Sequence, residues 1–265
     1  MGRLTALLIG QFRAWERPAQ IAMGLALALL ALALLALALS PSDLRQPIMI
    51  GFIGLIFVTQ AIFMWANRSM VTPFTRAQRQ YLAGDLAGAL ATLEPLATAE
   101  PADARALTLL GNTYRQVGRL EESARILTKA IGLRPFDPFP LCGFGRTLLV
   151  SGQYVEAVTV LRQALEAGAV PAVQVDLAEA LYRQGLGDEA RALLELNKDA
   201  AYEPHRQLMV DYLLYRLSAG APPAPDRIEN GLPFWKESAD RFAHTPYGQA
   251  LADDVRQMQS LVEEA

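Results

Sequence analysis

Two long apolar runs near the amino-terminal end of the chain predict the first elements. Residues 21–39 and residues 48–66 each hold nineteen residues without a charged side chain, and "LALALLALALLALAL" fills residues 25–39. A helix rises about 1.5 Å per residue, so about 20 apolar residues cross the hydrocarbon core of a bilayer. An unpaired strand could not stay in hydrocarbon, and alternation of Leu with Ala is not apolar–polar alternation. The pattern therefore predicts two transmembrane helices.

The residues around these two spans predict a hairpin and its orientation. The link "SPSDLRQP" has eight residues and two prolines, which suits a tight turn. Arginine is concentrated on the outer flanks of the pair, at Arg3, Arg13, Arg17, Arg68, Arg76 and Arg79, whereas the link has Arg45 alone. Since basic residues favour the cytoplasmic side, and Trp15 and Trp65 fall on that same side, we expect both termini in the cytoplasm of a bacterium and the hairpin in its inner membrane.

Two alternatives concern the segment before and within the first span. A cleaved export signal has an apolar core of 7–15 residues and a small-residue cleavage site. Here the core is longer, Pro41 would hinder cleavage after Ser40, and a second span follows at once, so a retained hairpin over 21–66 is favoured. Residues 1–20 form a separate segment, in which residues 4–15 either lie flat on the membrane or extend the first span.

Small residues mark one side of each predicted span. Gly24 and Ala28 lie four residues apart in the first span, and Gly51 and Gly54 lie in the second. Small residues let two helix backbones approach closely in a membrane. We therefore expect these four positions to pack the two spans together, although Ala-rich sequence produces such pairs readily.

After residue 70 an internal repeat with a period of 34 residues appears. Gly84, Gly118 and Gly152 lie 34 residues apart, and Gly185 follows after 33. A small residue comes five positions after each glycine and a leucine four positions later, at Ala89, Ser123, Ala157 and Ala190 and at Leu93, Leu127, Leu161 and Leu194. Repetition of this length is typical of stacked helical hairpins, and such a glycine ends the first helix of each hairpin.

The repeat resembles the tetratricopeptide repeat, and the second copy matches best. Its matching residues are Gly111, Tyr114, Gly118, Ser123, Leu127, Ala130 and Pro135. The resemblance covers residues 72–197, about four repeats, and the fourth copy diverges most. It implies an all-α chain in which the transmembrane hairpin is followed by an α-solenoid. Small residues would sit where helices approach closely and leucines between stacked neighbours, as scaffold without chemistry.

Residues 198–265 are expected to form a helical cap or tail. Residues 203–219 present Leu208, Tyr212 and Tyr215 on one side, and the Pro-rich stretch 220–226 ends that helix. Two more helices follow, and the last has apolar residues at helical spacing, at Leu251, Val255, Met258 and Val262. This tail either packs on the last repeat or receives a partner, and Phe234 and Trp235 anchor it or serve as a recognition element.

Composition and motifs argue against several function classes. The net charge of −3 gives no basic footprint for nucleic acid, and a single cysteine cannot form an intramolecular disulfide. The two histidines lie in separate segments, and no phosphate-binding loop or nucleophile motif is present. The acidic pairs Asp253–Asp254 and Glu263–Glu264 are interpreted as solvated helix charges. We therefore expect no enzyme activity, no metal and no cofactor.

The resemblance implies a concave groove, lined by the first helix of each repeat, that holds a segment of a protein partner. Carrying over the groove positions gives Arg105, Thr108, Asn112, Arg115, Phe139, Arg146, Leu149, Asp176, Glu179, Tyr182 and Arg183. Four of them, Arg105, Asn112, Arg115 and Arg146, can bind an anionic side chain or a carboxyl terminus by charge-assisted hydrogen bonds. The lysines of the family's carboxylate clamp are missing, and a solvated polar groove is the alternative.

Three functions fit these features. The first is a membrane-anchored adaptor or scaffold that recruits a protein partner, such as an assembly factor for a membrane complex. The second is a structural accessory subunit that other subunits of a membrane complex hold through the hairpin. The third is a periplasm-facing chaperone, because two spans followed by repeats are similar to the apocytochrome-handling protein of cytochrome c maturation. The short link and the arginine distribution argue against that third function.

Overall fold

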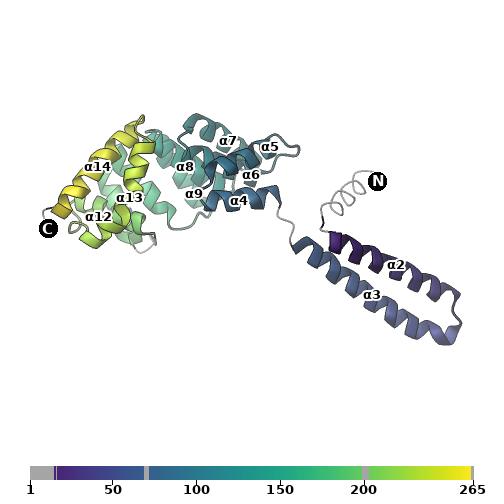
Figure 1. Ribbon diagram of the computed structural model, residues 1–265. Coiled ribbons are helices and arrows are strands. Elements are labelled where there is room, and N and C mark those ends of the chain that lie inside the picture. Colours follow the sequence, from purple (N-terminus) through teal and green to yellow (C-terminus); the bar gives the residue numbers. More distant parts are fainter. Residues whose placement is uncertain (1–14, 16, 69–71, 199–202, 264–265) are drawn as a thin grey trace. The chain divides into compact units, whose positions relative to one another are not determined.

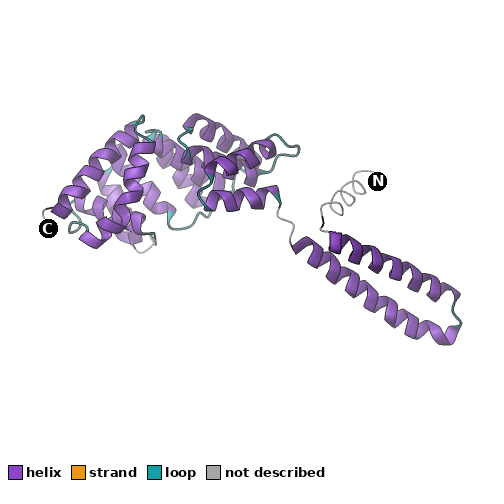
Figure 2. Cartoon of the chain, in the orientation of Figure 1, coloured by secondary structure: helices purple, strands orange, loops and turns teal. Residues whose placement is uncertain are grey.

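The computed structural model describes residue 15 and residues 17–68, 72–198 and 203–263 (Figure 1). This part of the chain forms thirteen helices and no strand, which confirms the predicted all-α class (Figure 2). The chain divides into two compact units, Met1–Thr72 and Pro73–Ala265. The interfacial helix considered for residues 4–15 lies outside the described residues except for Trp15.

The first unit is a hairpin of two long helices, α2 (Arg17–Leu39) and α3 (Ser42–Arg68). Both helices are long and apolar enough to cross a membrane. Large apolar side chains such as Leu25 and Phe57 are exposed along them. A surface of this kind is unfavourable in water and favourable in lipid.

The connection between the two helices is shorter than the sequence suggested. The predicted eight-residue link is wrong, because α3 begins at Ser42 and includes Pro47. Asp43 in the first turn of α3 favours an early start through the helix dipole. Pro47 costs that helix one backbone hydrogen bond without ending it. The tight turn of the hairpin is therefore made at Ser40 and Pro41.

The contact between α2 and α3 does not use the predicted small residues. Gly24, Ala28, Gly51 and Gly54 are exposed, and a Cβ atom at each of the three glycines would meet nothing within 4 Å. The buried cluster instead consists of Trp15, Ala19, Met23 and Ala66, with the Trp15 ring edge-on to Phe63 at 5.7 Å. The expected packing face was wrong because Gly24 lies one residue beyond Met23, about 100° further around the helix.

The second unit begins with four helical hairpins. They are α4 (Pro73–Leu82) with α5 (Leu86–Ala97), α6 (Ala104–Gln116) with α7 (Leu120–Leu133), α8 (Pro138–Val150) with α9 (Tyr154–Glu166), and α10 (Val173–Gln184) with α11 (Gly187–Asn197). The four turn glycines, Gly84, Gly118, Gly152 and Gly185, have φ angles of +78°, +79°, +83° and +88°. Residues with a Cβ atom rarely adopt this left-handed conformation, which explains the periodic glycine.

The repeated small residues and leucines form the interior of these hairpins. Ala89, Ser123, Ala157 and Ala190 have no exposed surface, and the leucine four positions after each is likewise buried. A Cβ atom on Gly145 of α8 would come within 2.7 Å of the Leu161 side chain in α9. The expected close approach of helices at small residues is thus confirmed.

This contact predicts opposite effects for two glycine substitutions. Gly145→Ala is expected to destabilise the second unit by about 1–3 kcal/mol, because the new methyl group overpacks against Leu161. Gly132→Ala, in an exposed part of α7 with nothing within 4 Å of the new Cβ atom, is expected to stabilise it by about 0.5–1 kcal/mol. Urea unfolding of the detergent-solubilised chain, followed by circular dichroism, measures both. Equal effects of the two substitutions on the free energy of unfolding would contradict the close contact between Gly145 and Leu161.

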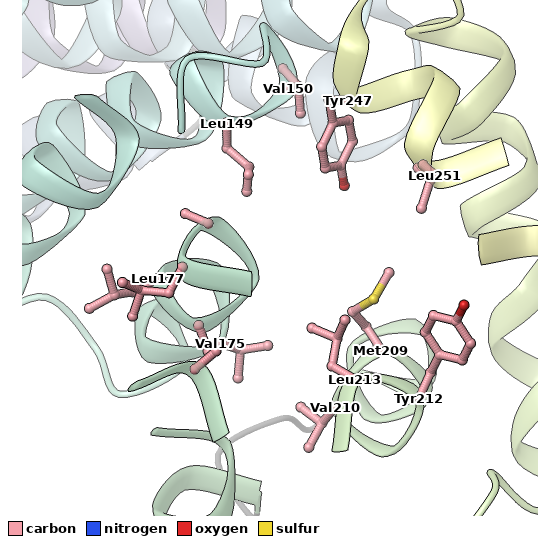
Figure 3. Packing of buried hydrophobic residues seen from close by; sticks show 14 of the residues in the cluster. Leu149, Val150, Val175, Leu177, Met209, Val210, Tyr212, Leu213, Tyr247 and Leu251 are labelled. Carbon is pink, nitrogen blue, oxygen red and sulfur yellow. The ribbon is translucent and has the colours of Figure 1, made fainter. Parts of the chain in front are cut away.

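Three further helices complete the second unit: α12 (Pro204–Arg216), α13 (Pro225–Arg241) and α14 (Pro246–Glu263). The last one returns to the repeats, since α14 contacts α8, and its Leu251, Val255 and Met258 are buried. Side chains from α8, α10, α12 and α14 converge on one interior in Figure 3. Of the two alternatives for the tail, packing on the repeats is therefore the one observed, while Val262 stays largely exposed.

Candidate functional site

The predicted groove is partly filled by the chain's own carboxyl-terminal helices. Tyr247 of α14 donates a hydrogen bond to Glu179 of α10, with 2.9 Å between the oxygens. Arg241 of α13 donates to the side chain of Gln116 in α6, at 2.6 Å. Thus α13 and α14 are bound to the first helices of the second and fourth repeats, and they occupy surface that a partner would otherwise reach.

The eleven predicted groove residues separate into an open set and a covered set. The open set lies outside the cavity: Arg105 and Phe139 are exposed, and Asn112 and Tyr182 are half-buried. Thr108 also lies outside the cavity, but it is buried and its hydroxyl donates to the Ala104 carbonyl. The covered set lines or adjoins one cavity of about 270 Å³ and consists of Arg115, Arg146, Leu149, Asp176, Glu179 and Arg183. The sequence pattern placed these residues on one face, but it did not predict the helices that cover them.

A buried ion network fastens α14 to the repeats. The Arg183 side chain is 6% exposed and lies between Glu179 at 3.7 Å and Asp254 at 2.5 Å. Tyr212 of α12 also donates to Asp254, at 2.9 Å. Burial raises the pKa of the Glu179 carboxyl despite the nearby Arg183. The interpretation of Asp254 as a solvated charge was wrong, because it is buried and accepts hydrogen bonds from two helices.

A second cluster of charges faces the cavity itself. Arg146 of α8 and Arg206 of α12 share the carboxylate of Asp176, at 2.6 and 3.2 Å. Burial alone would raise the pKa of Asp176, but the two guanidinium groups together lower it below its ordinary value. This cluster joins the third repeat, the fourth repeat and the cap at one carboxylate.

An aromatic wall from α12 and α13 closes the other side of the cavity. The rings of His205 and Phe234 stack with centroids 3.8 Å apart, and Trp235 donates its indole N–H to the His205 carbonyl at 2.7 Å. Trp235 is buried, as expected of an anchor, whereas Phe234 keeps an exposed edge. Burial, followed by the charge of Arg206, lowers the pKa of the His205 imidazole.

The lowered pKa of His205 predicts that the stability of the fold depends on pH. Because its pKa is lower in the folded state, the unfolded chain binds more protons as pH falls below 6.5, so the free energy of unfolding decreases there. His205→Gln is expected to reduce the loss of stability between pH 7 and pH 5.5 in urea unfolding. His244→Gln, at an exposed position, is the matched control and should leave the loss unchanged. If His205→Gln loses as much stability between pH 7 and pH 5.5 as the unmodified chain, His205 does not contribute to the pH dependence.

Several site residues escaped prediction because they lie outside the repeats. Arg206, His205 and Arg241 belong to α12 and α13, which have no repeat register from which a position can be carried over. Asp254 did leave a signal: it lies three residues after Leu251 and four before Met258, on the apolar face of the last helix.

Comparison with known proteins agrees with this architecture. Family models described as tetratricopeptide repeat match residues 74–138 and 148–206. A crystal structure of a thermophilic TPR protein of Thermus thermophilus is 15% identical, with a TM-score of 0.51 over 71% of this chain and 97% of that one. The structure named MamA MSR-1 is 22% identical, with a TM-score of 0.46 over 65% of this chain and 93% of that one. No curated protein matches the sequence.

Proposed function

We propose, from the premise that the chain belongs to the tetratricopeptide-repeat proteins, that it is a membrane-anchored adaptor that positions a protein partner. The observation behind this proposal is the combination of units within one chain. Two helices with exposed apolar side chains precede a repeat unit whose groove is left open at its first repeats. Anchoring a groove at a membrane raises the effective concentration of its partner there, so weak contacts suffice.

The open part of the groove is the surface that we assign to the partner. Arg105 at the start of α6 is exposed and pairs with the exposed Asp103 at 3.3 Å, a contact that a partner's carboxylate can replace at little cost. Phe139, one repeat later at the start of α8, is 72% exposed. A cation on one repeat and an exposed aromatic ring on the next suit an acidic segment with an apolar residue, and such a segment is the partner that we propose.

Substitutions in the open groove test this assignment. Arg105→Ala combined with Phe139→Ala is expected to weaken partner capture at least about tenfold, since an exposed aromatic anchor and a charged contact are lost together. Capture is measured by crosslinking and pull-down of the full chain from solubilised membranes. Phe136→Ala is the matched control, because Phe136 is 89% exposed but precedes α8. Retention of the same partners by the double variant would remove the open groove from the proposed function.

Orientation in the membrane is a separate part of the proposal. The arginine distribution favours cytoplasmic termini and an external turn in the bacterial inner membrane. Reporter fusions after residue 44 and after residue 265 test it, with an external and a cytoplasmic signal expected respectively. The reverse signals would instead support the periplasm-facing chaperone.

An accessory subunit of a larger membrane complex is the second candidate. It is favoured by the exposure of Gly51 and Gly54 on α3, where another helix has room to approach. Gly51→Leu with Gly54→Leu discriminates the two functions in the same pull-down. Loss of partners from this variant, together with their retention by the open-groove variant, would favour the accessory subunit over the adaptor.

A further inference from the structure

The cavity between the repeats and the cap differs in kind from the open groove. It has about 270 Å³ of space and is lined by Tyr81 of α4 and by residues of α6, α8 and α10 from the repeats, and by residues of α12, α13 and α14 from the cap. Because α13 and α14 are bound across the groove at Gln116 and Glu179, an extended protein segment cannot run through it. The space matches a compact ligand at the lower end of the usual pocket size.

The charges that line this cavity do not balance. Arg146 and Arg206 share the carboxylate of Asp176, and Glu203 lies 3.6 Å from Arg206. Glu179 already accepts from Tyr247 and lies beside Arg183. The three carboxylates that line the cavity are therefore already paired with arginines, and in the described part of the chain none of them makes an ion pair with a further cation.

Arg115 of α6 is that further cation. Its Nε atom is buried without a hydrogen-bond partner, and its guanidinium makes no ion pair within the described part of the chain. Burial, and next the charge of Arg146, lower the pKa of Arg115 to about 10. Arg115 is half-buried, its Nε atom is buried without a partner, and it lies near the like charge of Arg146, so the site favours an anion that pairs with it.

The aromatic side chains of the cap supply an apolar surface in the same cavity as Arg115. The indole N–H of Trp235 is already used by the His205 carbonyl, and the His205 and Phe234 rings stack on each other. Met209 and Phe242 extend this surface and add no hydrogen-bond donor from their side chains. A ligand that fills the cavity therefore needs an anionic head for Arg115 and an apolar body for this wall.

We propose that the cavity binds a small organic carboxylate with an apolar body. The carboxylate accepts hydrogen bonds from Arg115, and the body lies against the wall of His205, Phe234 and Trp235. Bound there, the ligand joins the second repeat to the cap, so its occupancy stiffens the attachment of α12 and α13. This site is independent of the open groove assigned to the protein partner.

The experiment uses the full chain in detergent and 3-phenylpropionate as the probe, with its neutral amide and inorganic phosphate for comparison. Calorimetric titration gives the affinity and thermal unfolding gives the midpoint. We expect 3-phenylpropionate to bind and to raise the midpoint, and Arg115→Met to weaken binding about tenfold or more, as for loss of a charged hydrogen bond. Equal binding of the amide, or binding of phosphate but not of the carboxylate, would overturn the proposed ligand class.

Two further variants keep the test decisive. Arg115→Met removes an unpaired charge, so it should fold with a midpoint no lower than that of the unmodified chain. Phe234→Ala leaves Arg115 in place and should weaken 3-phenylpropionate severalfold through loss of the wall. Arg191→Met, in an exposed pair with Glu195 on α11, is the matched control and should bind unchanged. Binding that is the same in the Arg115, Phe234 and Arg191 variants would refute the site.

Discussion

Asp254→Ala is expected to lower the free energy of unfolding of the second unit by about 3–5 kcal/mol, the usual cost of removing one partner from a buried ion pair. Arg183 would keep only Glu179, at 3.7 Å, and would remain buried without its closest acceptor. Tyr212 would lose the carboxylate oxygen that it contacts at 2.9 Å. Because these contacts attach α14 to α10 and α12, the change is expected to appear as undocking of α14.

Hydrogen exchange of the full chain in detergent separates this outcome from a general loss of stability. Amides of residues 246–263 should exchange faster in the Asp254→Ala variant, while those of α6 and α7 keep their protection. Asp253→Ala is the matched control, because its exposed carboxylate pairs with the exposed Arg256. That control is expected to change stability by less than about 0.5 kcal/mol.

A compensating pair of substitutions tests the physical cause. If the loss comes from the uncompensated charge, Arg183→Met combined with Asp254→Leu should recover most of the stability, since an apolar pair can replace a buried ion pair. If the double variant is as unstable as Asp254→Ala, the hydrogen bond from Tyr212 contributes more than the charge of Arg183.

The repeats were predictable because their constraints are local and recur. A left-handed turn needs glycine, and two helices in close contact need a small residue opposite a leucine, so Gly152, Ala157 and Leu161 reappear one period after their counterparts. The apolar runs were predictable for a similar reason, since helix length against bilayer thickness is a one-dimensional condition. These conditions involve residues that are near one another in sequence.

The cap and the cavity depend on contacts between distant residues, and the sequence pattern contains less information about them. The contact between Arg183 and Asp254 spans 71 positions, and Arg241 reaches Gln116 across 125. No period relates such residues, so the groove positions were assigned without the helices that cover half of them. Similarly, the face of α2 that meets α3 depends on rotation about the helix axis, which a Leu–Ala sequence leaves undetermined.

Asp176→Asn is the second substitution with a large expected effect, again about 3–5 kcal/mol of unfolding free energy. Arg146 and Arg206 would lose the negative charge that both contact, and the amide of asparagine would offer them one neutral acceptor. Urea unfolding of the full chain in detergent measures the loss, with Asp240→Asn at an exposed position of α13 as the matched control. A loss no larger than that of the control would show that the shared carboxylate contributes little.

The stability that Asp176 contributes should also depend on pH. The pKa of Asp176 is lowered in the folded state, so its stabilisation is fully present above its ordinary value of 3.8 and is lost as pH falls through the lower, folded value. Asp176→Asn should therefore remove part of the acid-induced loss of stability.

The coupling of Asp176 to Arg115 gives a separate test. The charge of Asp176 favours the charged form of Arg115, whereas Arg146 disfavours it, so Arg115→Met should recover stability when added to Asp176→Asn. Simple additivity of the two substitutions would show that Arg115 is not coupled to this carboxylate.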